Sequence, residues 1–174
     1  MKLAVIITGT VVIILFSWFL SISHGRYHGI PRLFAFESIF LLFLLNVRVW
    51  FHNPFSFTQI TSWILLILSV YAVVEGFWRL RKIGKPGRNF ENTTVLVKSG
   101  IYGLIRHPLY LSLFLVGTGI MMKDPGPEAL ILSAINLVAI YFTARMEEKE
   151  MTAKFGDAYR QYIKETKMFI PYIV

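Results

Sequence analysis

The chain has 174 residues, 55% of them hydrophobic and 16% aromatic, and several of its apolar runs are long enough to cross a membrane. This composition excludes an ordinary soluble domain and predicts an all-α polytopic membrane protein. Because the chain has no cysteine, disulfides, thiolate nucleophiles and cysteine metal sites are excluded as well. The formal net charge of +8 is typical of proteins that bind nucleic acid, but the positions of the charges argue against such a partner.

Five apolar segments are predicted to span the bilayer as helices. The first, residues 3–22, has a signal peptide as its alternative, but its length and the lack of a small-residue cleavage site favour a retained span. The others are expected at about 33–51, 57–80, 108–122 and 128–143. The 15 residues of the fourth segment give roughly 22 Å of helix, against a hydrocarbon core of about 30 Å. This helix is therefore expected to begin below the membrane surface or to lie where the bilayer is thin.

Spans four and five, joined by the turn at 123–127, are expected to form an antiparallel hairpin. The charged tail 145–174 has apolar residues at a spacing that predicts an amphipathic helix against the membrane or the protein: Met151, Phe155, Tyr159, Tyr162 and Ile163. Gly156 is expected to end one helix and Asp157 to cap the next. We expect a single membrane domain over 1–174, with three spans in 1–80 and a loop, the hairpin and the tail in 81–174.

The basic residues predict the orientation. With five spans, the connector 23–32, the loop 79–106 and the tail 145–174 lie on one membrane face. They hold two, seven and six Lys and Arg, which is 15 of the 18 in the chain. By the positive-inside rule, the N-terminus is outside and the C-terminus is cytoplasmic. This asymmetry explains the net charge without nucleic acid.

Polar residues within the spans are predicted to contact other helical residues. Glu75 lies four residues before Arg79, which is a favourable helical pair. Glu37 is expected to meet Arg79 or Arg81. The two asparagines expected to bond neighbouring helices are Asn46 and Asn136.

The stretch 99–110, where a basic loop turns into an apolar helix, is the first candidate site. Pro108 suits the first position of a helix, because its φ is already helical and its missing N–H is not needed there. The N–H groups of that turn, beside Arg106, can bind a carboxylate or phosphate. The simpler interpretation is a helix start with interfacial Arg and Tyr anchors, for which His107 is an unusual residue.

Glu147 and Glu148, just after the fifth span, form the second candidate site. The hairpin returns them to the membrane face of His107, where carboxylates are costly unless they are paired or bind a cation. Taken alone, a solvated helix start balanced by Arg145 and Lys149 explains them. Taken with His107, a polar pocket is favoured. The chain has no standard nucleotide-binding, serine-hydrolase or zinc-protease motif, and no metal site is predicted.

The two candidate sites carry a family resemblance. Leu96-Val97-x-x-Gly100-x-Tyr102, followed by Arg106-His107-Pro108-x-Tyr110, resembles the core of the isoprenylcysteine carboxyl methyltransferase and phospholipid methyltransferase superfamily. Glu147-Glu148, Phe155-Gly156-x-x-Tyr159 and Ile170-Pro171 resemble the C-terminal block of the same superfamily. The resemblance covers about residues 94–171.

The resemblance implies a membrane methyltransferase that uses S-adenosylmethionine without a Rossmann domain. Its acceptor would be a lipidic or prenylated molecule that enters from the bilayer, with membrane lipids as its other partners. Carried over by position, the adenosine would be lined by the backbone of Thr94, Val95, Leu96 and Val97 and by the side chain of Tyr102. His107, Pro108, Leu109 and Tyr110 would line the rest of the cofactor, and Glu147 would face the cationic end of the methionine moiety. Isoprenylcysteine enzymes have His at the position of Thr94 and a substrate-binding Arg at that of Thr143, so these departures bear mainly on a prenyl-cysteine substrate.

The chemistry of the acceptor selects the remaining candidates. Methyl transfer from a sulfonium needs alignment and a water-poor pocket more than a strong acid. A protonated amine must first lose a proton, and Glu148 or His107 is then the candidate base. A carboxylate or thiolate needs no base, and Arg145 or Arg106 is then its candidate anchor.

Two alternatives stay open at this point. Sterol reductases of related membrane architecture share part of the C-terminal pattern and imply a nicotinamide cofactor. The basic residues that the extra phosphate of NADPH would need are Arg79, Arg81, Lys82 and Arg88. The other alternative is a membrane scaffold without catalysis.

Overall fold

The structure, a computed structural model, describes residues 2–87 and 93–171. Its helices are α1 (Lys2–Leu20), α2 (Gly29–Asn46), α3 (Phe57–Ile83), α4 (Pro108–Met121), α5 (Pro127–Phe155) and α6 (Asp157–Glu165), with the 3₁₀ turns η1 (Ile22–His24), η2 (Val47–Val49) and η3 (Gly100–Gly103). Over the described ranges the chain forms no β-strand, only the isolated bridges Pro86–Thr93 and Ile105–Lys167. The predicted all-α class is confirmed.

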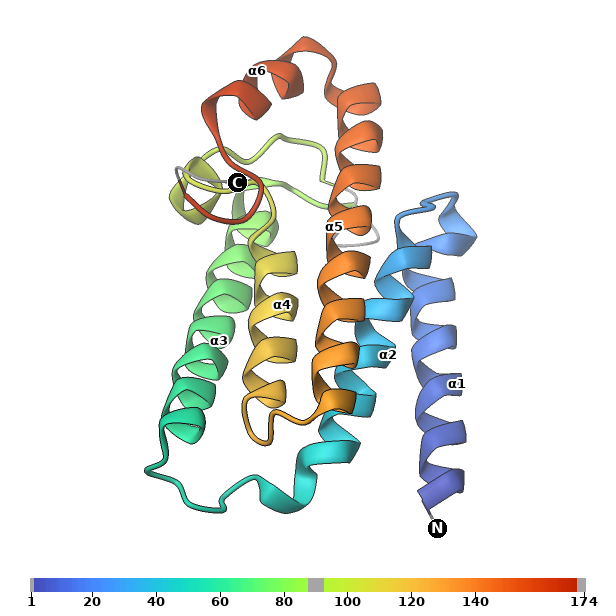
Figure 1. Ribbon diagram of the computed structural model, residues 1–174. Helices are drawn as coiled ribbons and strands as arrows, with labels where there is room; N and C mark the ends of the chain where they lie inside the picture. The colour runs from blue at the N-terminus through green and yellow to red at the C-terminus, as the bar shows by residue number, and fades with distance from the viewer. Residues whose placement is uncertain (1, 88–92, 172–174) are drawn as a thin grey trace.

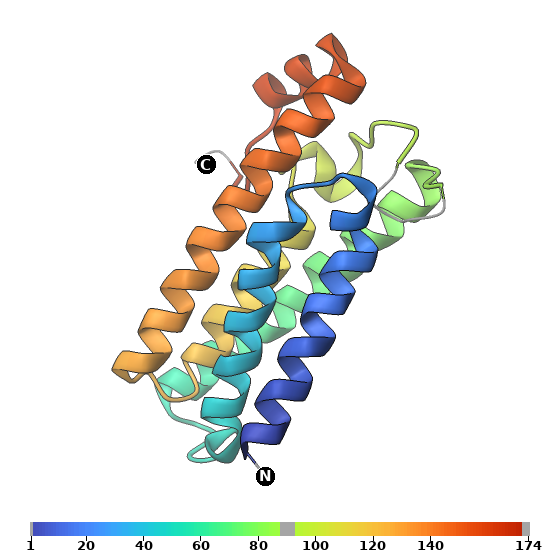
Figure 2. The same cartoon turned by 90° about the vertical axis from the view of Figure 1, so that its right-hand side faces the viewer.

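Helices α1 to α5 lie side by side in a bundle (Figure 1). Helix α4 packs between α3 and α5, α2 packs on both α4 and α5, and α1 lies at the edge against α2. Figures 1 and 2 show α6 and the loop between α3 and α4 gathered at the end of the bundle opposite the N-terminus. The connector between α1 and α2 lies toward the same end, so three segments far apart in sequence meet there.

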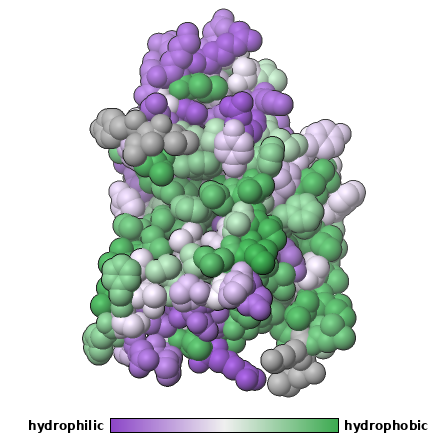
Figure 3. All heavy atoms as spheres, in the orientation of Figure 1, coloured by the Kyte–Doolittle hydropathy of each residue, from purple (hydrophilic) through white to green (hydrophobic). Residues whose placement is uncertain are grey.

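Four of the described helical segments are apolar and long enough to cross a membrane: Leu3–His24, Gly29–Val49, Phe57–Ile83 and Pro127–Phe155. Helix α4 is apolar but has only 14 residues, or about 21 Å. The shortness of the fourth segment was predicted, and of the five expected spans four reach full length. Figure 3 shows a hydrophobic band across this face of the molecule, with hydrophilic residues toward both ends. The band and the helices indicate an integral membrane protein.

Polar side chains join the helices as predicted. Nδ2 of Asn46 donates to the carbonyl of Ile120 at 2.8 Å, which links α2 to α4. Nδ2 of Asn136 donates to the carbonyl of Ala35 at 3.1 Å, which links α5 to α2. A Cβ at Gly117 would stand 2.6 Å from Oδ1 of Asn136, so glycine is what lets α4 approach α5 this closely.

The predicted contact of Glu37 with Arg79 or Arg81 is wrong. Glu37 instead accepts a hydrogen bond from Oγ1 of Thr10 at 2.7 Å, because α1 packs against α2 at this level. Nε of Arg79 donates to Oε1 of Glu75 at 2.7 Å, which confirms the helical pair. The side chain of Arg81 lies over the ring of Phe77 on its own helix.

Three helix boundaries also differ from the prediction. Helix α2 begins at Gly29 rather than near 33, so Arg32 lies in its first turn and not in the connector. Helix α5 does not end near 143 but continues unbroken through the charge-rich stretch 144–154 to Phe155, because most residues of this stretch are good helix formers. Gly156 ends α5 as predicted, but it is also the N-cap of α6; Asp157 lies in the first turn and pairs with Arg160 at 2.7 Å.

Candidate active site

The loop between α3 and α4 is fixed to α3 before it enters α4. At Gly100 φ is +62°, and a Cβ there would lie 2.5 Å from Nε of Arg79 and 2.7 Å from Oε1 of Glu75. Glycine alone fits this position, so η3 rests directly on the Glu75–Arg79 pair. Helix α4 then starts at Pro108, with His107 as its N-cap. The predicted helix start therefore fixes His107 at the end of α4.

The C-terminal segment closes over this loop through its backbone. The N–H of Arg106 donates to the carbonyl of Lys167 at 2.8 Å, and the N–H of His107 donates to that of Met168 at 3.2 Å. In return, the N–H of Lys167 donates to the carbonyl of Leu104 at 3.2 Å. The loop 100–107 is thus held by α3 at Gly100 and by residues 167 and 168 at its other end.

Arg106 and Glu148 form a buried ion pair. Nε of Arg106 lies 2.7 Å from Oε1 of Glu148, and the two side chains are 8% and 6% exposed. Nη1 of Arg145, a half-exposed residue, lies 3.5 Å from the other oxygen of Glu148. Nη1 of Arg106 also donates to two carbonyls of the C-terminal segment, those of Ile163 and Thr166. The pair therefore ties α5 to the loop and to the end of the chain.

His107 lies between two carboxylates. Its Nδ1 is 3.4 Å from Oε2 of Glu147, and its Nε2 is 3.5 Å from Oε1 of Glu148. Its ring stacks on Tyr110, with the ring centroids 5.4 Å apart. Burial lowers the pKa of His107, but Glu147 and Glu148 together outweigh burial and raise the pKa above its ordinary 6.5. The site thus favours the cationic form of the ring.

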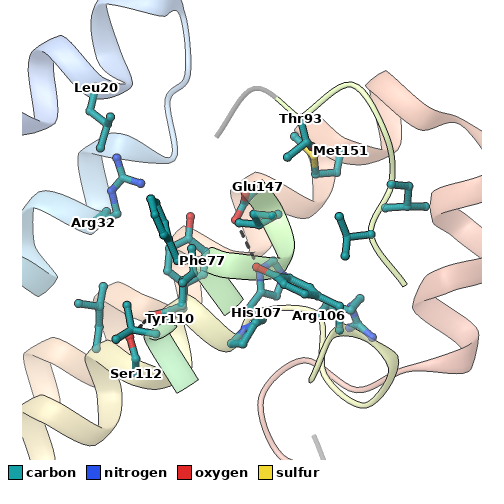
Figure 4. A pocket seen from close by; sticks show the side chains of 18 of the residues that line it. Leu20, Arg32, Phe77, Thr93, Arg106, His107, Tyr110, Ser112, Glu147 and Met151 are labelled. Atoms are coloured by element: carbon teal, nitrogen blue, oxygen red, sulfur yellow. Dashed lines mark hydrogen bonds and ion pairs between the residues drawn. The ribbon is translucent and has the colours of Figure 1, made fainter. Parts of the chain in front are cut away.

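A cavity of about 260 Å³ opens beside His107. Figure 4 shows Glu147, on α5, and His107, at the start of α4, pointing toward each other across the hairpin. The side chain of Glu147 is 22% exposed, which leaves its carboxylate accessible from the cavity that it lines. Apolar side chains of α1, α2 and α3 form another wall: Phe16, Leu20, Phe36, Val73, Phe77 and Leu80.

Three tyrosines line the cavity on the side of α6. Tyr102 belongs to η3, and Tyr159 and Tyr162 are buried residues of α6. Oη of Tyr162 donates to the carbonyl of Tyr102 at 2.6 Å, which fixes α6 to the loop. Burial raises the pKa of all three phenols, and the charge of Glu147 raises those of Tyr102 and Tyr159 further. The tyrosines therefore act as neutral aromatic surfaces.

A family model described as "Phospholipid methyltransferase" matches residues 57–158, more than half of the chain. The chain belongs to the phospholipid methyltransferase family. The matched residues run from the start of α3 into α6, so this family segment contains Tyr102, His107 and Glu147. The resemblance seen in residues 94–171 is confirmed, and it places the chain among the integral membrane methyltransferases.

Curated relatives of this family member are methyltransferases. The chain is 34% identical over 158 residues to protein-S-isoprenylcysteine O-methyltransferase of Homo sapiens, covering 84% of this chain and 53% of the relative. It is 31% identical over 125 residues to the enzyme of that name from Schizosaccharomyces pombe, covering 68% and 52%. It is 28% identical over 116 residues to methanethiol S-methyltransferase of Crocosphaera subtropica, covering 64% and 44%. The chain spans about half the length of these relatives, and no solved structure matches it significantly.

Most of the residues that the family resemblance selected for the cofactor line the cavity: Leu96, Val97, Tyr102, His107, Pro108, Leu109, Tyr110 and Glu147. Thr94 and Val95 do not. Oγ1 of Thr94 donates to the carbonyl of Lys85 at 2.9 Å, and Val95 is exposed. The neighbouring Thr93 lines the cavity in their place.

The residues predicted for the acceptor side are mostly engaged elsewhere. Arg145 does not line the cavity, because its side chain lies half exposed on the outer side of Glu148. Glu148 does not line it either, since it is buried against Arg106. Arg106 lines the cavity, but its guanidinium is held by Glu148 and two backbone carbonyls. Of these four candidates, Arg106 and His107 line the cavity, and only Arg106 is bound to Glu148 by a close ion pair. His107 is therefore the candidate best placed to contact a ligand.

Sequence reasoning missed several lining residues. From the sequence, Arg32 falls in the connector, although a charged residue at the edge of an apolar run is a signal that can mark a functional residue. Phe77 and Met151 also line the cavity, but as apolar residues of apolar or amphipathic helices they carry no distinguishing signal. Tyr159 was part of the family motif without an assigned role, and it now belongs to the aromatic wall.

Proposed function

We propose that the protein is an S-adenosylmethionine-dependent membrane methyltransferase whose methyl donor binds in the cavity beside His107. One observation carries the proposal. Two titratable side chains, 40 positions apart and on opposite arms of the hairpin, meet at 3.4 Å on the wall of a largely apolar cavity. Clustering of charged groups in a cleft is typical of functional sites, and both residues lie in the segment matched by the family.

The residues present fit this donor. S-adenosylmethionine supplies a methyl group activated by a sulfonium, and it also carries an ammonium, a carboxylate and a flat adenine. The carboxylate of Glu147 suits the cationic end of the methionine moiety, and the ring of His107, whose pKa is raised by its carboxylate neighbours, suits the carboxylate of that moiety. The faces of Tyr102 and Tyr159, together with Met151, suit the adenine.

The apolar wall from α1, α2 and α3 suits a lipophilic acceptor that enters from the bilayer. Displacement at a sulfonium needs an aligned acceptor and little water, and side chains such as Phe36 and Phe77 exclude water from that side. Glu147 and Glu148 raise the pKa of His107, so the ring keeps its proton to a higher pH than a free imidazole and is less available to take one from an amine. This environment favours an acceptor that is already anionic, such as a carboxylate or thiolate.

The same proposal gives the site an orientation. The connector, the loop and the tail that gather at the cavity end of the bundle hold most of the Lys and Arg of the chain. The positive-inside rule then puts the cavity at the cytoplasmic face and the N-terminus outside.

The nicotinamide alternative has less support. Of the basic residues it invokes, Arg79 pairs with Glu75, Lys82 lies over the ring of Trp78, and Arg81 lies over Phe77. None of these three lines the cavity, and Arg88 falls outside the described residues.

Calorimetric titration of the full chain in lipid nanodiscs tests the proposal. S-adenosylhomocysteine is expected to bind and NADPH is not. Methyl transfer from labelled S-adenosylmethionine into a lipid extract and a prenylated cysteine analogue, followed by identification of the product, then defines the acceptor. Binding of NADPH alone would support the reductase, and binding of neither compound would support the scaffold.

A further inference from the structure

Arg32 is the cavity residue that the donor site leaves unexplained. It lies in the first turn of α2, is only 5% exposed, and lines the cavity. A charged side chain at the edge of an apolar span is costly, and its presence there points to a functional role. Arg32 also precedes residues 57–158, so the segment shared with the family does not account for it.

The guanidinium of Arg32 is held in place by both N-terminal helices. Its Nη2 donates to Oγ of Ser21 at 2.5 Å, and Ser21 is a fully buried residue just after α1. Its Cζ lies 5.7 Å from the ring centroid of Phe36 on α2. A planar guanidinium presents a fork of five N–H donors that matches a carboxylate or a phosphate. The side chain is thus oriented before any ligand arrives.

Arg32 belongs to the acceptor side of the cavity. In Figure 4 it enters from α2, the His107–Glu147 pair lies on the other side, and Phe77 stands between them in this view. Around it the cavity wall is formed by Leu20 and Phe36. A guanidinium repels the sulfonium and ammonium groups of the donor, whereas an anion with an apolar chain meets a complementary surface here.

We propose that Arg32 binds an anionic group of the methyl acceptor, a carboxylate or a phosphate, while the apolar chain of the acceptor lies along α1 and α2. This inference rests on the proposed methyltransferase function and narrows its substrate to anionic amphiphiles. Arg32 acts as a binding and specificity residue: it orients the acceptor and takes no part in moving the methyl group.

The test measures how tightly three probes bind to the full-length protein in nanodiscs saturated with S-adenosylhomocysteine. All three probes carry the same farnesyl group. The probes are N-acetyl-S-farnesylcysteine, its neutral carboxamide and farnesyl monophosphate. The wild-type chain is expected to bind at least one anionic probe about tenfold or more tightly than the carboxamide, because a charge-assisted hydrogen-bond pair is worth about that factor. The carboxylate and phosphate arms separate a prenyl-cysteine-like acceptor from one with a phosphate headgroup.

The variants are Arg32→Gln, Arg32→Lys and, as a matched control, Arg160→Gln, whose exposed side chain pairs with Asp157. Arg32→Gln is expected to lose the preference for the anionic probe, and Arg32→Lys to keep part of it. The control is expected to keep all of it. Affinity for S-adenosylhomocysteine is expected to stay within about twofold in each variant, which also reports that the protein is folded.

Three results would overturn the inference. The first is an anionic preference unchanged in both Arg32 variants. The second is loss of S-adenosylhomocysteine binding in Arg32→Gln and Arg32→Lys alike, which would assign Arg32 to the donor. The third is a wild-type chain that binds S-adenosylhomocysteine but prefers neither anionic probe, which would refute the role of Arg32 and leave the proposed function standing. Failure of the wild-type chain to bind S-adenosylhomocysteine would instead refute the proposed function.

Discussion

His107 shows how a buried ring acquires a charge from its neighbours. Without Glu147 and Glu148, burial would favour the neutral imidazole; with them, the raised pKa favours the cation. The same contacts join the start of α4 to α5, so the protonation state of one ring is linked to the packing of the hairpin.

The His107→Gln variant tests this link. A group whose folded-state pKa is raised stabilises the protein fully below its unfolded pKa near 6.5, and this stabilisation is lost as the pH rises through the folded-state value. The thermal-unfolding midpoint of the wild-type chain is therefore expected to exceed that of His107→Gln most at about pH 6, and by progressively less toward about pH 9. A difference that does not vary with pH would show that folding leaves the pKa of His107 unshifted, and a difference that grows as the pH rises would show that the pKa is lowered.

The Arg106–Glu148 pair makes a separate prediction about stability. Removing one partner leaves a buried charge without its counterion, so Arg106→Met and Glu148→Met are each expected to cost about 3 kcal/mol. The double variant is expected to cost clearly less than the sum, because neither charge is then left alone. Chemical unfolding of the four proteins in one detergent measures this cycle, and additive losses would mean that the pair is not coupled.

At the scale of elements, the close contact of α4 with α5 positions the two arms of the site. Gly117 faces Asn136, whose Nδ2 bonds the carbonyl of Ala35 on α2. A side chain at position 117 would therefore disturb the packing of α4 on α5 and the bond from α5 to α2.

Gly117→Ala is expected to destabilise the protein by about 1–3 kcal/mol, because the added methyl group would displace the side chain of Asn136. Gly126→Ala is the matched control: its Cβ would meet Oε2 of Glu128 at an ordinary 3.6 Å, and its φ of −89° suits alanine. Gly126 is the N-cap of α5, where alanine is less favourable than glycine, so the control is expected to cost a smaller amount, about 0.5 kcal/mol. Equal effects of the two variants on the unfolding free energy would contradict the proposed packing.

At the scale of the whole molecule, orientation in the bilayer decides which compartment the cavity faces. The chain has no cysteine, so single cysteines report accessibility without a background. Asp124, between α4 and α5, and Asp157, at the start of α6, are both exposed and lie at opposite ends of α5.

A membrane-impermeant maleimide applied to intact cells is expected to label Asp124→Cys and to label Asp157→Cys only after the membrane is permeabilised. This follows from the positive-inside rule, which puts the basic end of the bundle in the cytoplasm. The opposite labelling pattern would invert the orientation and place the cavity outside.

Much of the architecture could be predicted from the sequence, because apolar runs, Pro108 and Gly156 act locally. The meeting of His107 and Glu147 followed from the hairpin, which needs only two adjacent spans. The partner of Glu37 and the place of Arg32 could not be predicted in the same way. They depend on which faces of α1 and α2 pack together, and in a lipid environment apolar composition does not specify the packing face.

The proposed function requires Glu147 to hold the cationic end of the methyl donor. Titration of S-adenosylhomocysteine into wild-type chain, Glu147→Gln and Glu128→Gln, each in nanodiscs, measures this contact. Glu128 is an exposed carboxylate at the far end of the same helix, so its variant is the matched control. Wild-type chain and Glu128→Gln are expected to bind alike and Glu147→Gln about tenfold or more weakly, because a charged contact is lost. Glu147→Gln that binds as tightly as the wild-type chain would contradict the account.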